Sequence, residues 1–201
     1  GFQRYQRSIG YQKLEAESRV TGGQKMRTKV SLSVLMLICL ILQCTLMPAI
    51  SIASITPNLM ISFTVSFGLM RGKKSGMLIG FFSGMLMDMT CMVLGYYVIG
   101  FRAFIYMYIG FLSGYCYQIF YDDDVKMPVL LTAAGDLAYG LIVYIVQFLL
   151  RGRVDFFFYL KRIIVPEMIY TVLVTLVLYR VFLFLNKKIE KKAKRSVDSF
   201  V

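Results

Sequence analysis

Histidine is absent from the 201-residue chain, and charged residues make up only 17% of it, against about 25% in an ordinary soluble domain. The absence of histidine excludes imidazole bases, serine–histidine and cysteine–histidine nucleophile pairs and histidine-based metal sites. Hydrophobic residues, in contrast, make up 58% of the chain. We therefore expect a membrane protein with no catalytic residue, no metal site and no cofactor.

The few charges gather at the two ends of the chain. Residues 1–29 carry seven basic and two acidic side chains, and residues 187–201 carry six basic and two acidic ones. Basic residues beside an apolar span attract anionic lipid headgroups. These basic runs lack the aromatic or motif context of nucleic-acid binding, so we expect membrane lipid as a partner and no nucleic acid.

One uncharged run is too long for a single membrane crossing. Residues 30–70 contain no charged side chain, and these 41 residues are twice the roughly 20 that a helix needs to cross the hydrocarbon layer. Pro48 and Pro57 bracket the polar centre of the run, and proline ends or kinks helices. The run therefore predicts two spans with a turn between these prolines.

Four further apolar stretches follow, interrupted by isolated charges. Backbone groups in lipid must be hydrogen-bonded within their own segment, so the spans are predicted to be helices. The expected fold class is an all-α membrane protein with six transmembrane helices at about residues 30–47, 57–70, 75–93, 99–120, 127–150 and 163–185.

Six crossings place both termini on one side of the membrane, and the positive-inside rule identifies that side as the cytoplasm. Basic clusters precede the first span, join the second and third spans, and follow the sixth. The last outer loop fits this orientation less well, because it would contain Arg151, Arg153, Lys161 and Arg162. We nevertheless keep the assignment, with this loop outside and both termini in the cytoplasm.

Residues 1–25 differ in composition from the rest of the chain. They have no long apolar run and contain Gln, Gly, Ser and Arg at loop-like density. We interpret them as a flexible N-terminal extension or as an artefact of the start site, because Met26 lies just before the first span. Residues 26–201 are expected to form one integral membrane domain with a basic cytoplasmic tail.

Glycines recur every four residues in the third and fourth expected spans. Four-residue spacing places residues on one face of a helix, and the missing side chains allow a second helix to approach closely. These faces predict either packing within the bundle or docking of a partner, and they comprise Gly72, Gly76, Gly80, Gly84, Gly110 and Gly114.

Isolated charges within the apolar spans are the second unusual feature. Each costs about 2.5–3.5 kcal/mol at mid-helix if it is unpaired. Asp88 and Arg102 flank an expected outer hairpin and are predicted to approach one another. Asp136 and Arg180 lie at similar depths and form a second candidate pair. Glu167 either joins Arg102 in a polar cluster or extends to the interface.

Several motifs follow one another in a fixed order along the chain: Pro57-Asn58-Leu59, Arg71-Gly72, Gly76, the run from Gly80 to Asp88, Leu94-Gly95 and the run from Gly110 to Gly114. This ordered set resembles the MreD family of rod shape-determining membrane proteins. The likeness covers about residues 26–192 and is strongest between residues 57 and 114. The family commonly has Asp where this chain has Asn58, which argues against any role that needs a charge at this position.

The resemblance implies a component of the bacterial plasma membrane that belongs to the cell-elongation machinery. It implies MreC as the direct partner, and the MreB filament, the glycosyltransferase RodA and its transpeptidase as indirect ones. It also implies a fold similar to the S components of energy-coupling vitamin transporters. The expected function is a non-enzymatic scaffold that binds MreC and helps to organise peptidoglycan synthesis. The alternative is an S-component-like transporter subunit that binds a small molecule.

Overall fold

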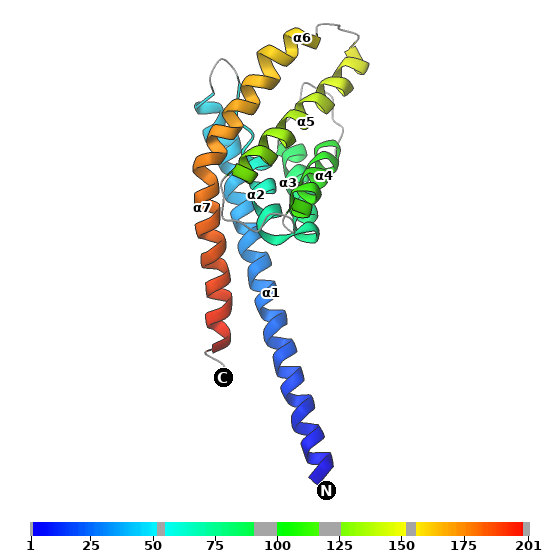
Figure 1. Ribbon diagram of the computed structural model, residues 1–201, viewed down its shortest axis with the longest axis vertical. Helices are drawn as coiled ribbons and strands as arrows, with labels where there is room; N and C mark the ends of the chain where they lie inside the picture. Colours follow the sequence, from blue (N-terminus) through cyan, green and yellow to red (C-terminus); the bar gives the residue numbers. More distant parts are fainter. Residues whose placement is uncertain (1, 52–54, 91–99, 117–125, 152–155, 199–201) are drawn as a thin grey trace. The chain divides into compact units, whose positions relative to one another are not determined.

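The computed structural model describes residues 2–51, 55–90, 100–116, 126–151 and 156–198. Within these ranges the chain is helical and forms no β-strand, which confirms the expected all-α fold class. The elements are α1 (Phe2–Ala49), α2 (Leu59–Arg71), α3 (Lys73–Thr90), α4 (Phe101–Cys116), α5 (Lys126–Arg151), α6 (Phe156–Tyr159), the π-helix η1 (Leu160–Ile164) and α7 (Val165–Asp198) (Figure 1).

The chain divides into two compact units, and the long helices α1 and α7 contribute to both of them. Unit 1 comprises residues 1–35 and 184–201, and unit 2 comprises residues 36–183. Unit 1 therefore combines the N-terminal part of α1 with the C-terminal part of α7. The residues expected to form a flexible extension are helical from Phe2 onward, as part of α1.

Three helical stretches are long and apolar enough to cross a membrane: residues 26–49, 126–146 and 157–189. They correspond to the first, fifth and sixth expected spans. The last begins earlier than expected, because α6, η1 and α7 follow one another without a break. The other three expected spans correspond to α2, α3 and α4, which have 13, 18 and 16 residues within the described ranges. The expected end of the third span, both ends of the fourth span beyond residues 100–116, and the Leu94-Gly95 motif lie outside the described residues.

Local backbone features set the ends of the short helices. Helix α1 ends at Ala49, one residue after Pro48, and α2 begins at Leu59, so the turn expected between the two prolines is confirmed. Gly72 has a φ of 83° and ends α2 directly before α3 begins. A positive φ is favourable only for glycine among the common residues, which explains why the helix breaks there.

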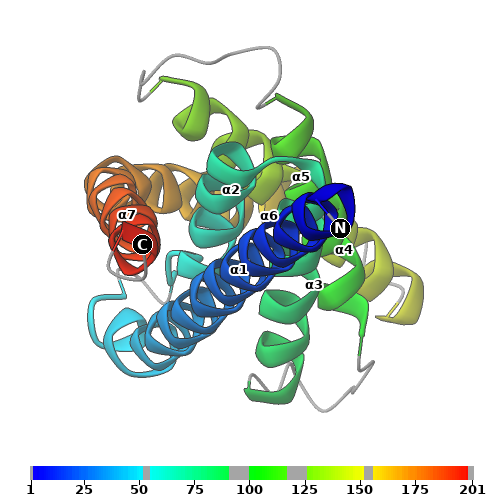
Figure 2. The same cartoon turned by 90° about the horizontal axis from the view of Figure 1, so that it is seen from below.

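Helix α2 forms the core of unit 2. Its residues from Leu59 to Leu69 are all buried, and Met60, Phe63 and Phe67 have no exposed surface. Figure 2 shows α2 between α7 and α4, and it also contacts α3 and α5. A helix that is covered on every side must satisfy its polar groups through its neighbours, which places the polar residues around α2 at the centre of the structure.

Candidate functional site

The Pro57-Asn58-Leu59 motif forms a hydrogen-bonded junction where α2 begins. The side-chain amide of Gln43, on α1, donates to the Pro57 carbonyl at 3.2 Å and accepts from the Leu59 N–H at 2.7 Å. Gln43 is therefore a clamp that ties α1 to the first turn of α2. The first backbone N–H groups of a helix have no partner within the helix, and Gln43 supplies one of the missing acceptors.

Asn58 connects this junction to two more helices. Its Oδ1 caps α2 by accepting the Ile61 N–H at 3.3 Å, and it also accepts the Tyr106 hydroxyl of α4 at 3.0 Å. Its backbone N–H donates to Thr171 Oγ1 of α7 at 3.0 Å. Asn58 is buried, so these bonds join α2, α4 and α7 in a region from which water is excluded.

Hydroxyl groups extend the junction along the contact between α2 and α7. Thr175 Oγ1 lies 3.0 Å from Ser62 Oγ and 2.7 Å from the Thr171 carbonyl, within hydrogen-bonding distance of both. Below them, Phe182 of α7 packs against Phe63 with ring centroids 5.6 Å apart. The contact is thus polar near the start of α2 and aromatic farther along it.

Asp136 is the most unusual polar residue of unit 2. It is 3% exposed, and neither of its carboxylate oxygens has a hydrogen-bond partner among the described residues. The hydroxyls of Thr64 and Thr132 are likewise buried without a partner in this part of the chain. Asp136 interacts electrostatically with Tyr106 and with Glu167.

The structure does not bring the second candidate ion pair together. Arg180 lies on an exposed face of α7, whereas Asp136 is buried and unpaired in the described structure. The prediction matched the depths of the two residues, but depth says nothing about the direction in which each helix face points. Glu167 is half-buried and interacts electrostatically with both Asp136 and Arg102.

Asp88 and Arg102 lie close together, with Arg102 Nε 3.9 Å from Asp88 Oδ1. The carboxylate does more than pair with the guanidinium. Asp88 Oδ2 accepts backbone N–H groups from Gly100 at 2.8 Å, Arg102 at 3.2 Å and Ala103 at 3.4 Å. Asp88 of α3 therefore caps the N-terminus of α4, where the helix dipole and the unpaired N–H groups favour a negative charge.

The regularly spaced glycines lie where α3 and α4 pack backbone against backbone. A Cβ added to Gly84 would lie 2.5 Å from the Arg102 carbonyl oxygen, and one added to Gly114 would lie 2.6 Å from the carbonyl carbon of Gly72. Real Cβ atoms essentially never approach other atoms this closely. The same holds where Gly76 meets Gly110.

Gly80 completes the contact by facing the Tyr106 carbonyl. Tyr106 thus supports two features at once, because its backbone lies against the glycine face of α3 and its hydroxyl binds Asn58. Gly68 of α2 also lies against Gly110, which extends the close packing to a third helix. The glycine faces are therefore covered by helices of this chain.

No metal-binding cluster is present in the described ranges. No group of three or more cysteine and carboxylate side chains there is placed to hold a metal ion. No disulfide joins Cys39, Cys44 and Cys116 to one another. The polar groups of unit 2 are instead arranged to join helices.

Sequence reasoning missed the residues that complete the junction. Gln43, Tyr106 and Thr171 were not among the predicted site residues, although each binds the Pro57-Asn58-Leu59 motif. A glutamine in the middle of an uncharged span is the one signal that sequence inspection offered, because an amide in lipid needs partners.

A family model described as rod shape-determining protein MreD matches residues 24–189 of this chain. The match includes the junction, the glycine faces and the Asp88 cap. No curated protein matches the chain, and no solved structure matches it. The expected similarity to transporter S components therefore has no support.

Proposed function

Since the chain belongs to the MreD family of rod shape-determining proteins, we propose that it acts as a non-enzymatic membrane scaffold of the cell-elongation machinery. In this role it binds the single transmembrane helix of MreC and helps to organise peptidoglycan synthesis by RodA and its transpeptidase, beside the MreB filament. It lies in the bacterial plasma membrane with both termini in the cytoplasm. The match to the family over residues 24–189 is the observation that carries this proposal.

The packing of the glycines narrows the search for the docking face. A partner helix cannot use Gly76, Gly80 or Gly84, because α4 already lies against them. On α3 and α4, the residues available to a partner are those on the opposite faces. These outward faces carry exposed apolar side chains: Met77, Leu78, Phe81 and Phe82 on α3, and Phe104, Tyr108, Phe111, Leu112 and Tyr115 on α4.

We assign the docking of MreC to the outward face of α4. Its exposed residues recur at three- and four-residue spacing and therefore form one continuous stripe. Aromatic side chains dominate the stripe, and large rigid side chains provide much of the contact energy in protein interfaces. Within lipid, such a stripe gains specificity from shape rather than from apolarity, because the lipid tails are equally apolar.

The proposal is tested by co-purification with MreC from detergent extracts. Phe111→Ala with Leu112→Ala removes the centre of the stripe but keeps it apolar, so membrane insertion is preserved. We expect this pair to lower the recovered MreC at least about fivefold, which corresponds to the loss of two well-packed side chains.

The matched control changes two exposed apolar residues on α7, through Leu173→Ala with Val177→Ala. MreC recovery should remain at the wild-type level in this variant. Equal recovery with wild type, the α4 pair and the α7 pair would refute the assignment of the docking face. A failure of the wild-type chain to recover MreC at all, or to restore rod shape in cells depleted of their own MreD, would refute the scaffold itself.

A further inference from the structure

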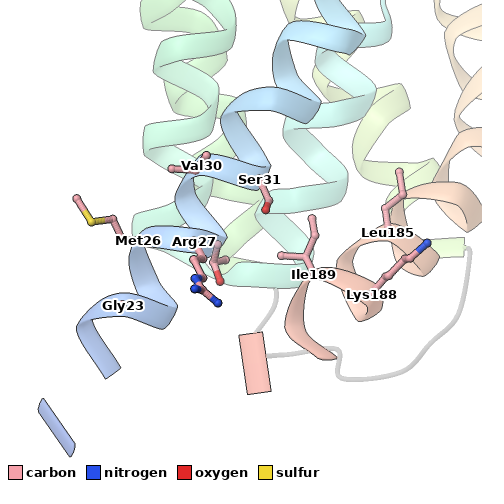
Figure 3. Close-up of a pocket in the computed structure, with 9 residues that line it drawn as sticks. Gly23, Met26, Arg27, Val30, Ser31, Leu185, Lys188 and Ile189 are labelled. Carbon is pink, nitrogen blue, oxygen red and sulfur yellow. The ribbon is translucent and has the colours of Figure 1, made fainter. Parts of the chain in front are cut away.

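Unit 1 contains a groove that the scaffold role leaves unexplained. The groove has a volume of about 740 Å³, within the range of small-ligand sites. It lies between the N-terminal part of α1 and the C-terminal part of α7 (Figure 3). Its lining residues are Gly23, Met26, Arg27, Thr28, Val30, Ser31, Leu185, Lys188 and Ile189.

The lining changes from apolar to cationic along both helices. Val30 on α1 and Leu185 on α7 form the apolar part, and each lies three residues from a cation, Arg27 and Lys188 respectively. Three residues of helix correspond to about 4.5 Å. On each helix, the cation therefore lies this distance along the helix axis from the apolar residue. Figure 3 shows Ile189 on the side of α7 that faces α1.

The position of the groove in the chain matches the boundary between hydrocarbon and headgroups. The apolar stretches of residues 26–49 and 157–189 both end at the groove. The apolar part therefore borders the lipid tails, and the cationic part reaches the depth of the phosphate groups. A ligand that fills the groove must be apolar at one end and anionic at the other.

The two segments that contain the lining carry charge of one sign. Glu190 follows the second segment, and residues 23–31 and 185–189 themselves carry five basic side chains and no acidic one. They include Arg27 and Lys188 in the lining and the exposed Lys29 beside it. Hydroxyl groups of Thr28 and Ser31 add neutral donors suited to phosphate oxygens. No such set is needed for a zwitterionic headgroup, whose own cation balances its phosphate.

We propose that this groove is a binding site for one anionic phospholipid, such as phosphatidylglycerol. Arg27 and Lys188 bind the phosphate, Thr28 and Ser31 donate to its free oxygens, and an acyl chain lies along Val30 and Leu185. Basic pockets between transmembrane helices bind anionic headgroups in this way. The bound lipid joins the two ends of the chain that form unit 1. The proposal is independent of the docking of MreC, which was assigned to unit 2.

The test is a lipid titration of the delipidated full-length protein in detergent, followed by native mass spectrometry. The probes are phosphatidylglycerol and phosphatidylcholine with identical acyl chains. We expect the wild-type protein to bind phosphatidylglycerol at least about tenfold more tightly. Arg27→Gln with Lys188→Gln should weaken phosphatidylglycerol binding roughly 30-fold, as expected for two basic residues near the surface. Phosphatidylcholine binding should barely change.

The matched control removes the same amount of charge elsewhere, through Lys161→Gln with Arg162→Gln, two exposed residues at the other end of the 157–189 stretch. It should weaken phosphatidylglycerol binding less than threefold. Equal effects of the two double variants would show that net charge alone attracts the lipid, and would overturn the site. An absence of preference for phosphatidylglycerol in the wild-type protein would overturn it as well.

A second variant tests the apolar part of the groove without changing any charge. Leu185→Trp fills the groove and should weaken phosphatidylglycerol binding about tenfold, and this variant decides the question if the charge variant fails to purify. Unchanged binding in Leu185→Trp would overturn the proposal. Inorganic phosphate at millimolar concentration should not displace the lipid, because it lacks an acyl chain. Full displacement by phosphate would identify the site as one for a free anion and would likewise overturn it.

Discussion

The side chain of Asn58 receives both of its hydrogen bonds at one oxygen atom. Because Oδ1 accepts from Ile61 and Tyr106, a carboxylate oxygen can take the same place. The N-terminus of α2 also favours a negative charge at its cap. This explains how a chain with Asn58 keeps the arrangement that a family member with Asp would have.

Two substitutions at position 58 distinguish the effect of the hydrogen-bond acceptor from the effect of charge. Asn58→Asp should change the free energy of unfolding in mixed micelles by less than about 1 kcal/mol, because it retains the acceptor. Asn58→Leu, which is similar in size, should lower it by about 2–4 kcal/mol, from the lost cap and the unpaired Tyr106 hydroxyl. Tyr106→Phe is the control, since it removes only one bond and should lose about 1 kcal/mol. Equal stability of the Leu and Asp variants would contradict the role of Asn58 as a cap.

Asp88 should act mainly as the cap of α4 and only secondarily as the partner of Arg102. Asp88→Asn keeps an acceptor for the backbone N–H groups and should lose less than about 1 kcal/mol of unfolding free energy, whereas Asp88→Ala should lose about 2 kcal/mol. Exchanging the two residues, with Arg at position 88 and Asp at position 102, should not restore the loss, because a guanidinium has no acceptor. Recovery of wild-type stability in the exchanged protein would show that the ion pair dominates.

Hydroxyl residues explain why sequence reasoning identified only part of the junction. The Thr175 hydroxyl lies within hydrogen-bonding distance of the Thr171 carbonyl in its own helix and of the Ser62 hydroxyl on α2. Ser66 and Ser113, in contrast, donate within the described structure to carbonyls four residues earlier in their own helices. In either case the hydroxyl can bond to a carbonyl of its own helix. The presence of Ser or Thr in a span therefore does not reveal whether the side chain also contacts a second helix.

The contact between α3 and α4 depends on glycine at each point where the backbones meet. An alanine Cβ at Gly80 would lie 2.7 Å from the carbonyl carbon of Tyr106, so the helices must separate. Gly80→Ala should therefore lower the free energy of unfolding by about 1–3 kcal/mol, even though alanine favours helix. Thermal unfolding in detergent, followed by circular dichroism, measures the change.

Gly22→Ala is the matched control, because this glycine lies within α1 and an added Cβ would meet nothing within 4 Å. It should leave stability unchanged or raise it by up to about 1 kcal/mol. A loss of stability at Gly22 equal to that at Gly80 would contradict the packing argument.

Helix positions could be predicted from the sequence where apolar length or a proline sets them. They were harder to predict where a local hydrogen bond or backbone angle sets the end of the helix. The uncharged run predicted the stretch at residues 26–49, the apolar composition predicted the one at residues 126–146, and the two prolines predicted the first turn. Four-residue glycine spacing predicted a close helix contact, although not its partner. The short length of α2 depends on Asn58 at one end and on the positive φ of Gly72 at the other, and neither feature has a hydrophobic signature.

The arrangement of the chain across the membrane follows from its longest apolar stretches. Residues 157–189 form one helical run, and about 45 Å of helix separates Lys161 from Lys191, more than the thickness of the hydrocarbon core. We therefore expect these two residues on opposite sides of the membrane. The positive-inside rule predicts Lys191 in the cytoplasm, because the basic tail follows it, and Lys161 outside despite its charge.

Single cysteines test this arrangement in intact cells. In a background with Cys39, Cys44, Cys91 and Cys116 replaced by Ala, Lys161→Cys should react with a membrane-impermeant maleimide without permeabilisation. Lys29→Cys and Lys191→Cys should react only after permeabilisation, since both lie beside the basic clusters that the rule assigns to the cytoplasm. The two cytoplasmic positions serve as controls for each other, because an even number of crossings requires them to behave alike. Labelling of Lys29→Cys and Lys191→Cys from opposite sides would rule out six crossings and would remove the common cytoplasmic face on which the proposed scaffold depends.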